Sequence, residues 1–233
     1  MSVYDSAIRS KIAYQNLEDV LKIIPTAEFI SNEEYDTQVY FWRIGEIVYV
    51  TFRGTSSFKD VLTDLNISTY RIRDKIRVHE GFYMQFKSVE IEITKRLVHN
   101  FDATRIIFAG HSLGGALAQI AAAYYGEIFD YSFVACHTFG SPRVGNKYFV
   151  EWFSKHVDEN VRIANKKDPV PMIPTMYYWV HTTNDTPWYK RLYKVLFKSN
   201  LSEHSCDLYI QNISVENNNA KVRDCSSPVP GEL

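Results

Sequence analysis

The sequence predicts an α/β fold in which helices flank a mixed, largely parallel central sheet. Short apolar runs typical of buried strands alternate with amphipathic runs typical of helices along most of the 233 residues. An apolar content of 45% suits one domain with a sizeable core, and no repeat or linker divides the chain. We therefore expect one domain over residues 1–212 and a polar, flexible C-terminal tail over 213–233.

The expected elements follow one another in chain order. Residues 6–24 have apolar positions at helical spacing, and Val39–Trp42 and Ile47–Phe52 predict two strands separated by Gly45-Glu46. Helices are then expected at 82–99, 113–125 and 146–156, and strands at 105–109, 133–138 and 161–164. Strands that pair locally and then alternate with helices favour a mixed sheet over a purely antiparallel one.

Composition argues against several classes of protein. The formal net charge is −1, so no broad basic field suggests a nucleic-acid partner. No apolar run is long enough to span a membrane, and the polar N-terminus lacks the apolar stretch of a signal peptide. We expect a monomer that is cytoplasmic or peripherally membrane-associated, and secretion of a processed form stays open. The three cysteines are Cys136, Cys206 and Cys225; neither they nor the histidines have metal-ligand spacing, so no metal or cofactor is expected.

The most informative segment is Gly110-His111-Ser112-Leu113-Gly114. It follows an apolar run and precedes an alanine-rich helical run, which is the strand, sharp turn and helix order of a nucleophile elbow. In such a turn the serine has a strained backbone, and a side chain at Gly110 or Gly114 would collide with its neighbours. Ser112 would project at the start of a helix, whose N–H groups favour a developing negative charge. This pattern predicts an esterase.

A serine nucleophile needs a base, and the base needs an acid that orients it. Asp168 is the best candidate acid, because it directly follows a predicted strand and lies in a turn stiffened by prolines. Two later histidines could act as the base, His181 and His204. Their order and spacing do not separate them.

An oxyanion hole requires two N–H donors. The first comes from Leu113, the residue after the nucleophile. The loop 52–57 follows a predicted strand and offers a glycine, backbone donors and hydroxyl groups for the second. On this evidence alone the loop could equally be an ordinary polar strand end.

At this point the chain resembles the fungal-type (class 3) lipase family, which has the α/β-hydrolase fold. The matching segments keep the family's order and cover about residues 10–212: 51–57, 78–82, Gly110–Gly115, 138–146 and 168–171. The resemblance implies that Ser112 is the nucleophile, Asp168 the acid and His204 the base. It aligns Thr55 with the family's second oxyanion residue and His181 with a histidine of the family that is not catalytic.

A short amphipathic helix is predicted directly after Thr55. Its apolar residues Phe58, Val61, Leu62 and Leu65 fall at i, i+3, i+4 and i+7. The periodicity alone also fits a helix that faces the core. In the family that the chain resembles, this segment is a lid over the acyl pocket. Such a lid is expected to be closed in water and open on a lipid surface.

Residues 187–198 predict a second amphipathic helix. Its apolar residues are Trp188, Leu192, Val195 and Leu196, and its basic residues are Lys190, Arg191, Lys194 and Lys198. A basic helix with aromatic residues is suited to an anionic membrane surface, so we expect a peripheral membrane contact here. The alternative is a helix packed on the domain with solvated lysines.

These observations predict a serine hydrolase that cleaves carboxylic ester bonds of lipids at a lipid–water interface. An acylglycerol lipase, acting above all on triacylglycerols, is the first expectation. A phospholipase A1 or a soluble carboxylesterase would use the same triad with a different pocket. A catalytically silent lipid-binding module is the alternative from another class of protein, and the presence of all three triad residues argues against it.

Overall fold

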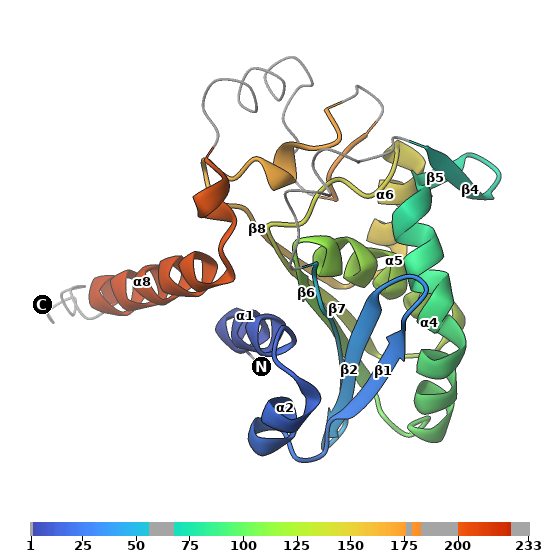
Figure 1. Cartoon of the computed structure of the whole chain (residues 1–233), viewed down its shortest axis with the longest axis horizontal. Coiled ribbons are helices and arrows are strands. Elements are labelled where there is room, and N and C mark those ends of the chain that lie inside the picture. The colour runs from blue at the N-terminus through green and yellow to red at the C-terminus, as the bar shows by residue number, and fades with distance from the viewer. Residues whose placement is uncertain (1, 56–67, 176–178, 183–199, 225–233) are drawn as a thin grey trace, which may run out of the picture.

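A six-stranded sheet forms the centre of the molecule (Figure 1). The structure, a computed structural model, describes residues 2–55, 68–175, 179–182 and 200–224. The strands of this sheet are β1 (Glu28–Asn32), β2 (Thr37–Ile44), β3 (Ile47–Phe52), β6 (Arg105–His111), β7 (Phe133–Phe139) and β8 (Glu159–Ile163), and they lie side by side in that order. A separate hairpin is formed by β4 (Thr69–Arg73) and β5 (Ile76–His79).

The direction of the strands determines where a site can form. β1, β2 and β3 pair antiparallel, whereas β3, β6, β7 and β8 are all parallel. Phe52 of β3 pairs with Gly110 of β6, and His111 pairs with Phe139 of β7. The carboxyl ends of these strands therefore meet at one edge of the sheet, which is the usual place for a binding site in an open α/β sheet.

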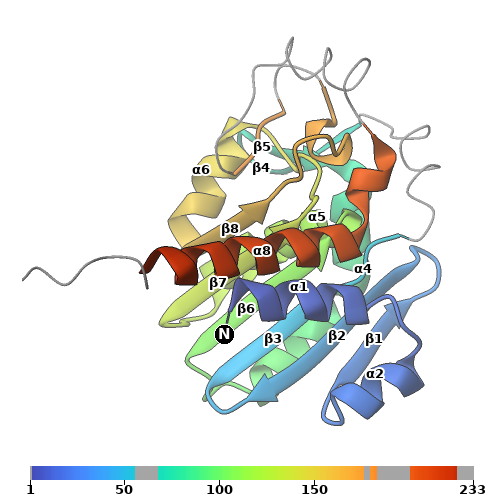
Figure 2. The same ribbon diagram turned by 90° about the vertical axis from the view of Figure 1, so that its left-hand side faces the viewer.

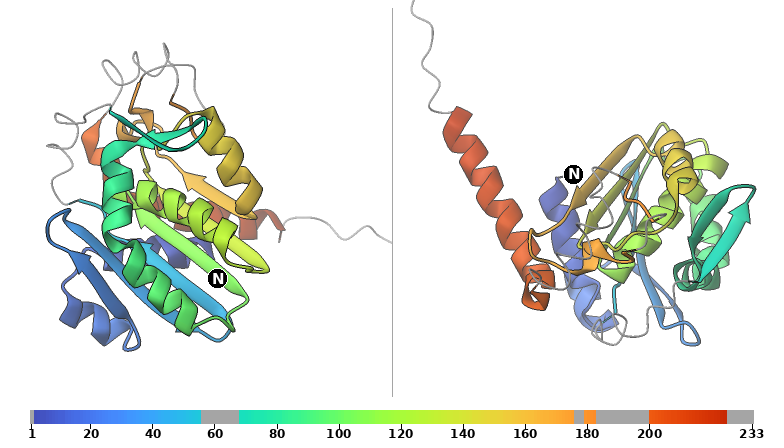
Figure 3. Two further views of the ribbon diagram at one scale, coloured as in Figure 1. Left: turned by 90° about the vertical axis from the view of Figure 1, so that its right-hand side faces the viewer. Right: turned by 90° about the horizontal axis from the view of Figure 1, so that it is seen from above.

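Helices cover both faces of the sheet (Figures 2 and 3). On one face lie α4 (Glu80–His99), α5 (Leu113–Ile128) and α6 (Lys147–His156), and on the other lie α1 (Val3–Ile12), α2 (Leu17–Ile23) and α8 (Cys206–Asp224). The alternation within β2 explains the two layers: Val39 and Phe41 pack under α4 and α5, whereas Tyr40 and Trp42 face α1 and α2. The predicted α/β architecture with a mixed, mainly parallel sheet is confirmed.

The N-terminal helical region differs from the expectation of helical residues over 6–24. It forms two helices, because Asn16 ends the first stretch and its side chain accepts a hydrogen bond of 2.9 Å from the Asp19 N–H at the start of α2. α1 begins earlier than expected, at a capping box formed by Ser2 and Asp5. The chain between the helices turns at Ala13 and Tyr14, and this turn places Tyr14 beside the site described below.

The C-terminal region also differs from the expectation of a flexible tail from residue 213. Helix α8 continues to Asp224. Tyr209 and Ile213 pack with Ala7 of α1 and Phe139 of β7, so the core extends past residue 212. α8 is therefore part of the domain, because this packing supplies the apolar contacts that a helix of polar composition otherwise lacks.

Two of the predicted elements, the lid at 58–65 and the basic segment at 187–198, lie outside the described residues. Among the helices that the structure does describe, none has the length and apolar character needed to cross a bilayer. Within the same residues, no group of three or more histidine, cysteine, aspartate or glutamate side chains is placed to hold a metal ion.

Candidate active site

The turn between β6 and α5 has the geometry of a nucleophile elbow. Ser112 has φ 58° and ψ −128°, a strained conformation for a residue other than glycine. The two flanking glycines are required by contact. A Cβ on Gly110 would lie 2.3 Å from the backbone of Gly114, and one on Gly114 would lie 2.2 Å from the carbonyl oxygen of Phe52. The Gly-x-Ser-x-Gly spacing therefore describes a close approach of strand and helix.

The backbone of Ser112 holds the residue in place. Its hydroxyl group makes no hydrogen bond to another described residue. Its N–H donates to the carbonyl oxygen of Phe139, 2.9 Å away at the end of β7. The residue itself is fully buried. The backbone thus fixes the position of the Oγ atom. No hydrogen bond to a described residue has to break before this atom can react.

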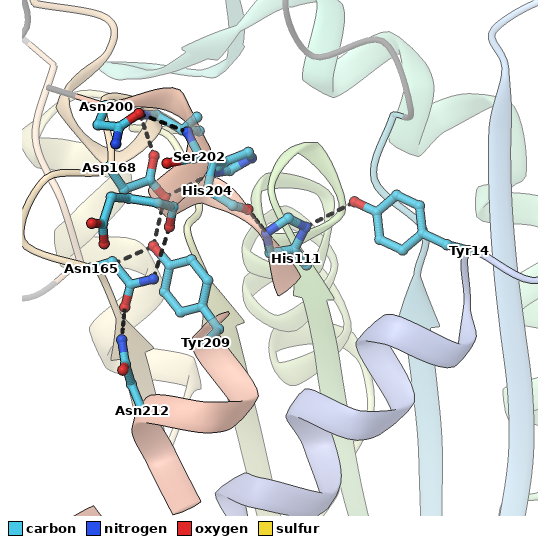
Figure 4. A network of polar contacts seen from close by, with 11 residues as sticks. Tyr14, His111, Asn165, Asp168, Asn200, Ser202, His204, Tyr209 and Asn212 are labelled. Carbon is cyan, nitrogen blue, oxygen red and sulfur yellow. Dashed lines mark hydrogen bonds and ion pairs between the residues drawn. The ribbon is translucent and has the colours of Figure 1, made fainter. Parts of the chain in front are cut away.

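Asp168 lies in the turn that leads from β8 to the short 3₁₀ helix η1 (Val170–Met172). Its side chain is buried and receives three hydrogen bonds (Figure 4). Oδ2 accepts from His204 Nδ1 at 2.8 Å and from the Tyr209 hydroxyl at 2.6 Å, and Oδ1 accepts from the Val170 N–H at 2.8 Å. Three hydrogen-bond donors stabilise the charged carboxylate in this buried position, where an unpaired charge would be costly.

His204 ends the second 3₁₀ helix, η2 (Leu201–His204), directly before α8. Because a carboxylate only accepts hydrogen bonds, Nδ1 of His204 carries the proton that is shared with Asp168. Nε2 is then the basic nitrogen of the neutral ring. This is the tautomer and orientation that a general base needs.

Gly140 explains how the histidine and the carboxylate fit beside the elbow. It follows Phe139, which accepts the Ser112 N–H, and it has a positive φ of 63°. A Cβ on Gly140 would lie 3.0 Å from the His204 ring and 3.1 Å from Asp168 Oδ2. The His204–Asp168 pair therefore packs against Gly140, which directly follows the residue that accepts the Ser112 N–H.

The structure separates the two histidines that spacing alone left open. His204 binds Asp168, whereas His181 Nε2 bonds to the carbonyl oxygen of Pro171 at 2.6 Å. His181 is buried in the segment after η1 and joins that segment to Pro171. This bond joins the His181 ring to the backbone, and the assignment of the base to His204 rather than His181 stays a prediction.

The two expected oxyanion residues lie on either side of the elbow. Leu113 is the first residue of α5, so its N–H has no partner within the helix. Gly54, which precedes Thr55, packs so closely that a Cβ there would lie 2.6 Å from the carbonyl oxygen of His111. The loop after β3 thus runs directly past the nucleophile turn, as the parallel pairing of β3 and β6 requires.

A cavity of about 610 Å³ opens beside this group of residues. Thr55, His111 and His204 line one side of it. The other lining residues come from the end of α1 and from the η2–α8 junction: Lys11, Tyr14, Gln15, Leu201, Ser202, Ser205, Cys206 and Asp207. His204 therefore borders a cavity on the side of α1 and α8, whereas Ser112 is not among the residues that line it.

Three residues of the site were not expected from the sequence: the half-buried Tyr14 and the buried His111 and Tyr209. His111 lies inside the elbow motif, but nothing in the motif indicates what its ring contacts. Burial and the nearby Asp168 charge raise the pKa of Tyr209, so its hydroxyl keeps its proton and donates to the carboxylate. Tyr209 belongs to α8, the helix that the sequence analysis did not predict.

Comparison with known proteins agrees with this geometry. A model of the family "Lipase (class 3)" matches residues 49–178, which is more than half of the chain. The secreted mono- and diacylglycerol lipase 1 of Fusarium solani is 30% identical over 149 residues, which cover 60% of this chain and 43% of that protein. A lipase of Rhizopus niveus is 32% identical over 149 residues, which cover 60% of this chain and 38% of that protein. The matched part thus spans less than half the length of these curated relatives.

Solved structures extend the likeness of the fold over most of the chain. The lipase of Rhizopus microsporus var. chinensis superposes with a TM-score of 0.67 at 22% identity and covers 87% of this chain and 83% of its own. A triacylglycerol lipase described as having a serine protease triad superposes with a TM-score of 0.70 at 22% identity, covering 86% of this chain and 90% of its own. These likenesses concern the fold, and the family match concerns the sequence. Together they place the chain in the class 3 lipase family, a family of α/β hydrolases.

Proposed function

We propose that this protein is a serine hydrolase that cleaves carboxylic ester bonds of lipids, with acylglycerols as its substrates. The observation that carries the proposal is the hydrogen bond from His204 Nδ1 to Asp168 Oδ2 beside the strained elbow at Ser112. The names of the Fusarium solani and Rhizopus niveus relatives support the same chemistry.

In this mechanism Ser112 Oγ attacks the acyl carbonyl carbon, and Nε2 of His204 takes the hydroxyl proton. Asp168 orients His204 and stabilises the imidazolium that forms. The N–H groups of Thr55 and Leu113 donate to the oxyanion, a contribution of about 3–4 kcal/mol for each such donor. The carbon–oxygen bond of the ester then breaks, and the departing alcohol takes the proton from His204.

The second half of the reaction regenerates the enzyme. Water attacks the acyl group on Ser112 while His204 accepts a proton from the water. The bond to Ser112 Oγ breaks, His204 returns the proton to the serine, and the fatty acid leaves. All the protons in this cycle move through groups of the chain itself, so the proposal requires no cofactor.

The lid at 58–65 and the membrane contact at 187–198 are part of this proposal and stay predictions from the sequence. A lid with apolar residues at one face would be stabilised in the open form by a lipid surface. A basic amphipathic segment would add electrostatic attraction to anionic lipids. Both properties suit an enzyme that acts at a lipid–water interface.

The proposal is tested with three substrates: a short p-nitrophenyl ester, triolein and phosphatidylcholine. The wild type should hydrolyse the short ester and triolein, and Ser112→Ala should lose both activities. Ser132→Ala is a matched control, because the Ser132 hydroxyl bonds to the Thr104 carbonyl in a turn far along the sheet from Ser112. Turnover of phosphatidylcholine instead of triolein would favour a phospholipase A1. Turnover of the short ester alone would favour a soluble carboxylesterase, and lipid binding without any hydrolysis would favour a binding module.

A further inference from the structure

A chain of hydrogen bonds connects Tyr14 with the segment that carries His204 (Figure 4). The Tyr14 hydroxyl lies 2.9 Å from His111 Nδ1, and His111 Nε2 lies 2.7 Å from the carbonyl oxygen of His204. At the other end, the Tyr14 hydroxyl packs against the loop that carries Thr55. A Cβ on Gly54 would lie only 2.1 Å from the Tyr14 oxygen, so the approach is close.

The direction of every bond in this chain follows from the groups at its ends. A carbonyl oxygen only accepts, so His111 Nε2 donates to His204, and Nδ1 of a neutral ring is then the acceptor for the Tyr14 hydroxyl. The order is Tyr14 O–H to His111 and His111 N–H to His204, with Gly54 packed against the Tyr14 oxygen.

This order requires that His111 stays neutral. Burial, followed by the charge of His204, lowers the pKa of His111 to about 3. Burial raises the pKa of Tyr14, so its hydroxyl keeps the proton that it donates. The last group of the chain is the backbone carbonyl of His204, which does not titrate. These hydrogen bonds therefore persist over the pH range in which a histidine base works.

The two ends of the chain act in the same chemical step under the proposed function. The loop after β3 would supply an oxyanion donor, and η2 supplies the base. These segments lie far apart in the sequence, and none of the described strands or helices joins them directly. Errors of a fraction of an ångström between donor, base and substrate are costly to a reaction of this kind.

We infer that Tyr14 and His111 are positioning residues that fix the oxyanion loop and the base relative to each other. The inference rests on the proposed function. It assigns a catalytic purpose to α1 and its following turn, which lie outside the residues matched by the family model. Tyr14, Thr55, His111 and His204 also line one cavity, so the chain borders the space that a substrate would enter.

The test is the variant Tyr14→Phe, which removes the hydroxyl and keeps the ring. Its matched control is Tyr40→Phe, because Tyr40 is a buried tyrosine whose hydroxyl also makes one hydrogen bond, to the backbone carbonyl of Gln15 at 3.3 Å and not to His111. On a soluble p-nitrophenyl ester, Tyr14→Phe should lower kcat about 10-fold, a loss of the size expected for a misplaced donor. KM should stay within about 2-fold of the wild-type value, since ground-state binding is not the target.

His111 supplies two further variants. His111→Phe removes both ring nitrogens and should lower kcat about as much as Tyr14→Phe, and the double variant should lose little more, because both changes break one chain. His111→Gln keeps an N–H that can donate to the His204 carbonyl and should recover part of the loss.

The inference is overturned if Tyr14→Phe and Tyr40→Phe have equal kcat, or if the losses from Tyr14→Phe and His111→Phe multiply. Thermal midpoints identify any variant that fails through unfolding, and His111→Gln then decides the question. The same assay includes Ser112→Ala. Activity that survives in Ser112→Ala contradicts the proposed function, whereas an activity that needs Ser112 but not Tyr14 contradicts this inference alone.

Discussion

Two clusters among the described residues contain a serine, a histidine and an acid, and their geometry differs. The first is the Ser112 site, formed by Ser112, His204 and Asp168, in which His204 bonds to Asp168 and the Ser112 hydroxyl bonds to no described residue. The second is the Ser6 cluster, in which the Ser6 hydroxyl lies 2.7 Å from His137 Nδ1 and His137 Nε2 lies 2.7 Å from Glu159 Oε1. The Ser6 cluster thus joins all three groups by hydrogen bonds, whereas the Ser112 site joins two of them.

The backbone of the serine is the first difference. Ser6 lies within α1, in regular helical conformation, and its N–H bonds to the Ser2 carbonyl. Ser112 lies between a strand and a helix at a positive φ, directly before a helix N-terminus. Only the second position offers backbone donors to an oxyanion next to the nucleophile.

The histidine and the acid are the second difference. Ser6 and Ser112 are both buried, but His204 lines the cavity beside the Ser112 site and His137 does not. The Glu159 side chain is 47% exposed, whereas Asp168 is buried among three donors. The Ser6 cluster therefore joins α1 to the sheet, and it is the backbone geometry that distinguishes the proposed nucleophile Ser112 from the structural Ser6.

Removal of each serine should give the largest contrast. Ser112→Ala should lower turnover of a soluble ester by at least about 10³-fold, because the nucleophile is lost while oxyanion donors remain. Ser6→Ala should keep turnover and lower the free energy of unfolding by about 1 kcal/mol, since one buried hydrogen bond is lost. Steady-state kinetics and urea unfolding of both variants check this. Loss of turnover in Ser6→Ala, with turnover kept in Ser112→Ala, would contradict this interpretation of the two clusters.

Removal of each histidine tests the same difference between the Ser112 site and the Ser6 cluster. His204→Ala should lose about as much turnover as Ser112→Ala, and the double variant should be no worse, because the residues act as one unit. His137→Ala should mainly reduce stability, and so should His181→Ala, whose ring bonds to a backbone carbonyl. A large loss of turnover in His181→Ala would instead exchange the roles of the two candidate bases.

The contacts of the two acids give a smaller effect. Tyr209→Phe removes one of the three donors to Asp168 and should lower kcat about 3- to 10-fold, with KM little changed. The matched change at the Ser6 cluster is Glu159→Gln, which leaves a hydrogen-bond acceptor for His137. It should leave kcat unchanged. Equal kcat in Tyr209→Phe and the wild type would show that the Tyr209 hydroxyl does not orient Asp168.

The smallest effect concerns stability in acid. The pKa of His111 is about 3 in the folded protein and 6.5 in its ordinary state, so below pH 6.5 the unfolded chain takes up a proton that the folded protein does not. Stability is therefore complete above pH 6.5 and decreases as the pH falls toward 3. Between pH 7 and pH 5 this histidine alone should cost about 2 kcal/mol.

Urea unfolding at both pH values measures that loss. Burial also lowers the pKa of His137, which adds to the loss in the same direction. The histidines are distinguished by His111→Gln, in which the loss between pH 7 and pH 5 should shrink by the amount assigned to His111. His204, Tyr14 and Tyr209 surround the His111 ring and remain in this variant. An unchanged loss would mean that His111 is already protonated in the folded protein.

The sequence predicted the parts of this molecule whose patterns are local. The Gly-x-Ser-x-Gly spacing requires a tight turn whatever lies around it, and the buried strands β2, β3, β6 and β7 are apolar runs between clear boundaries. The loop at Thr55 and the acid at Asp168 could be selected because parallel strands bring their carboxyl ends together.

The remaining parts depend on contacts between distant segments. Spacing could not choose between His181 and His204, since the choice is made by where η2 places its last residue. Tyr14 reaches the site from the turn after α1, and Tyr209 reaches it from α8. No periodicity indicates that α1 and α8 pack on the same face of the sheet (Figure 2). For α8 the polar composition predicted a flexible chain, and tertiary packing of Tyr209 and Ile213 overrides that tendency.

The most direct test of the account is the site of covalent labelling by a serine-reactive phosphonate. Peptide mass spectrometry of the labelled wild-type protein should find a single adduct, on Ser112, and Asp168→Asn should be labelled much more slowly because His204 is no longer held as a base. An adduct on Ser6, or hydrolysis of esters that continues while Ser112 remains unlabelled, would contradict the account.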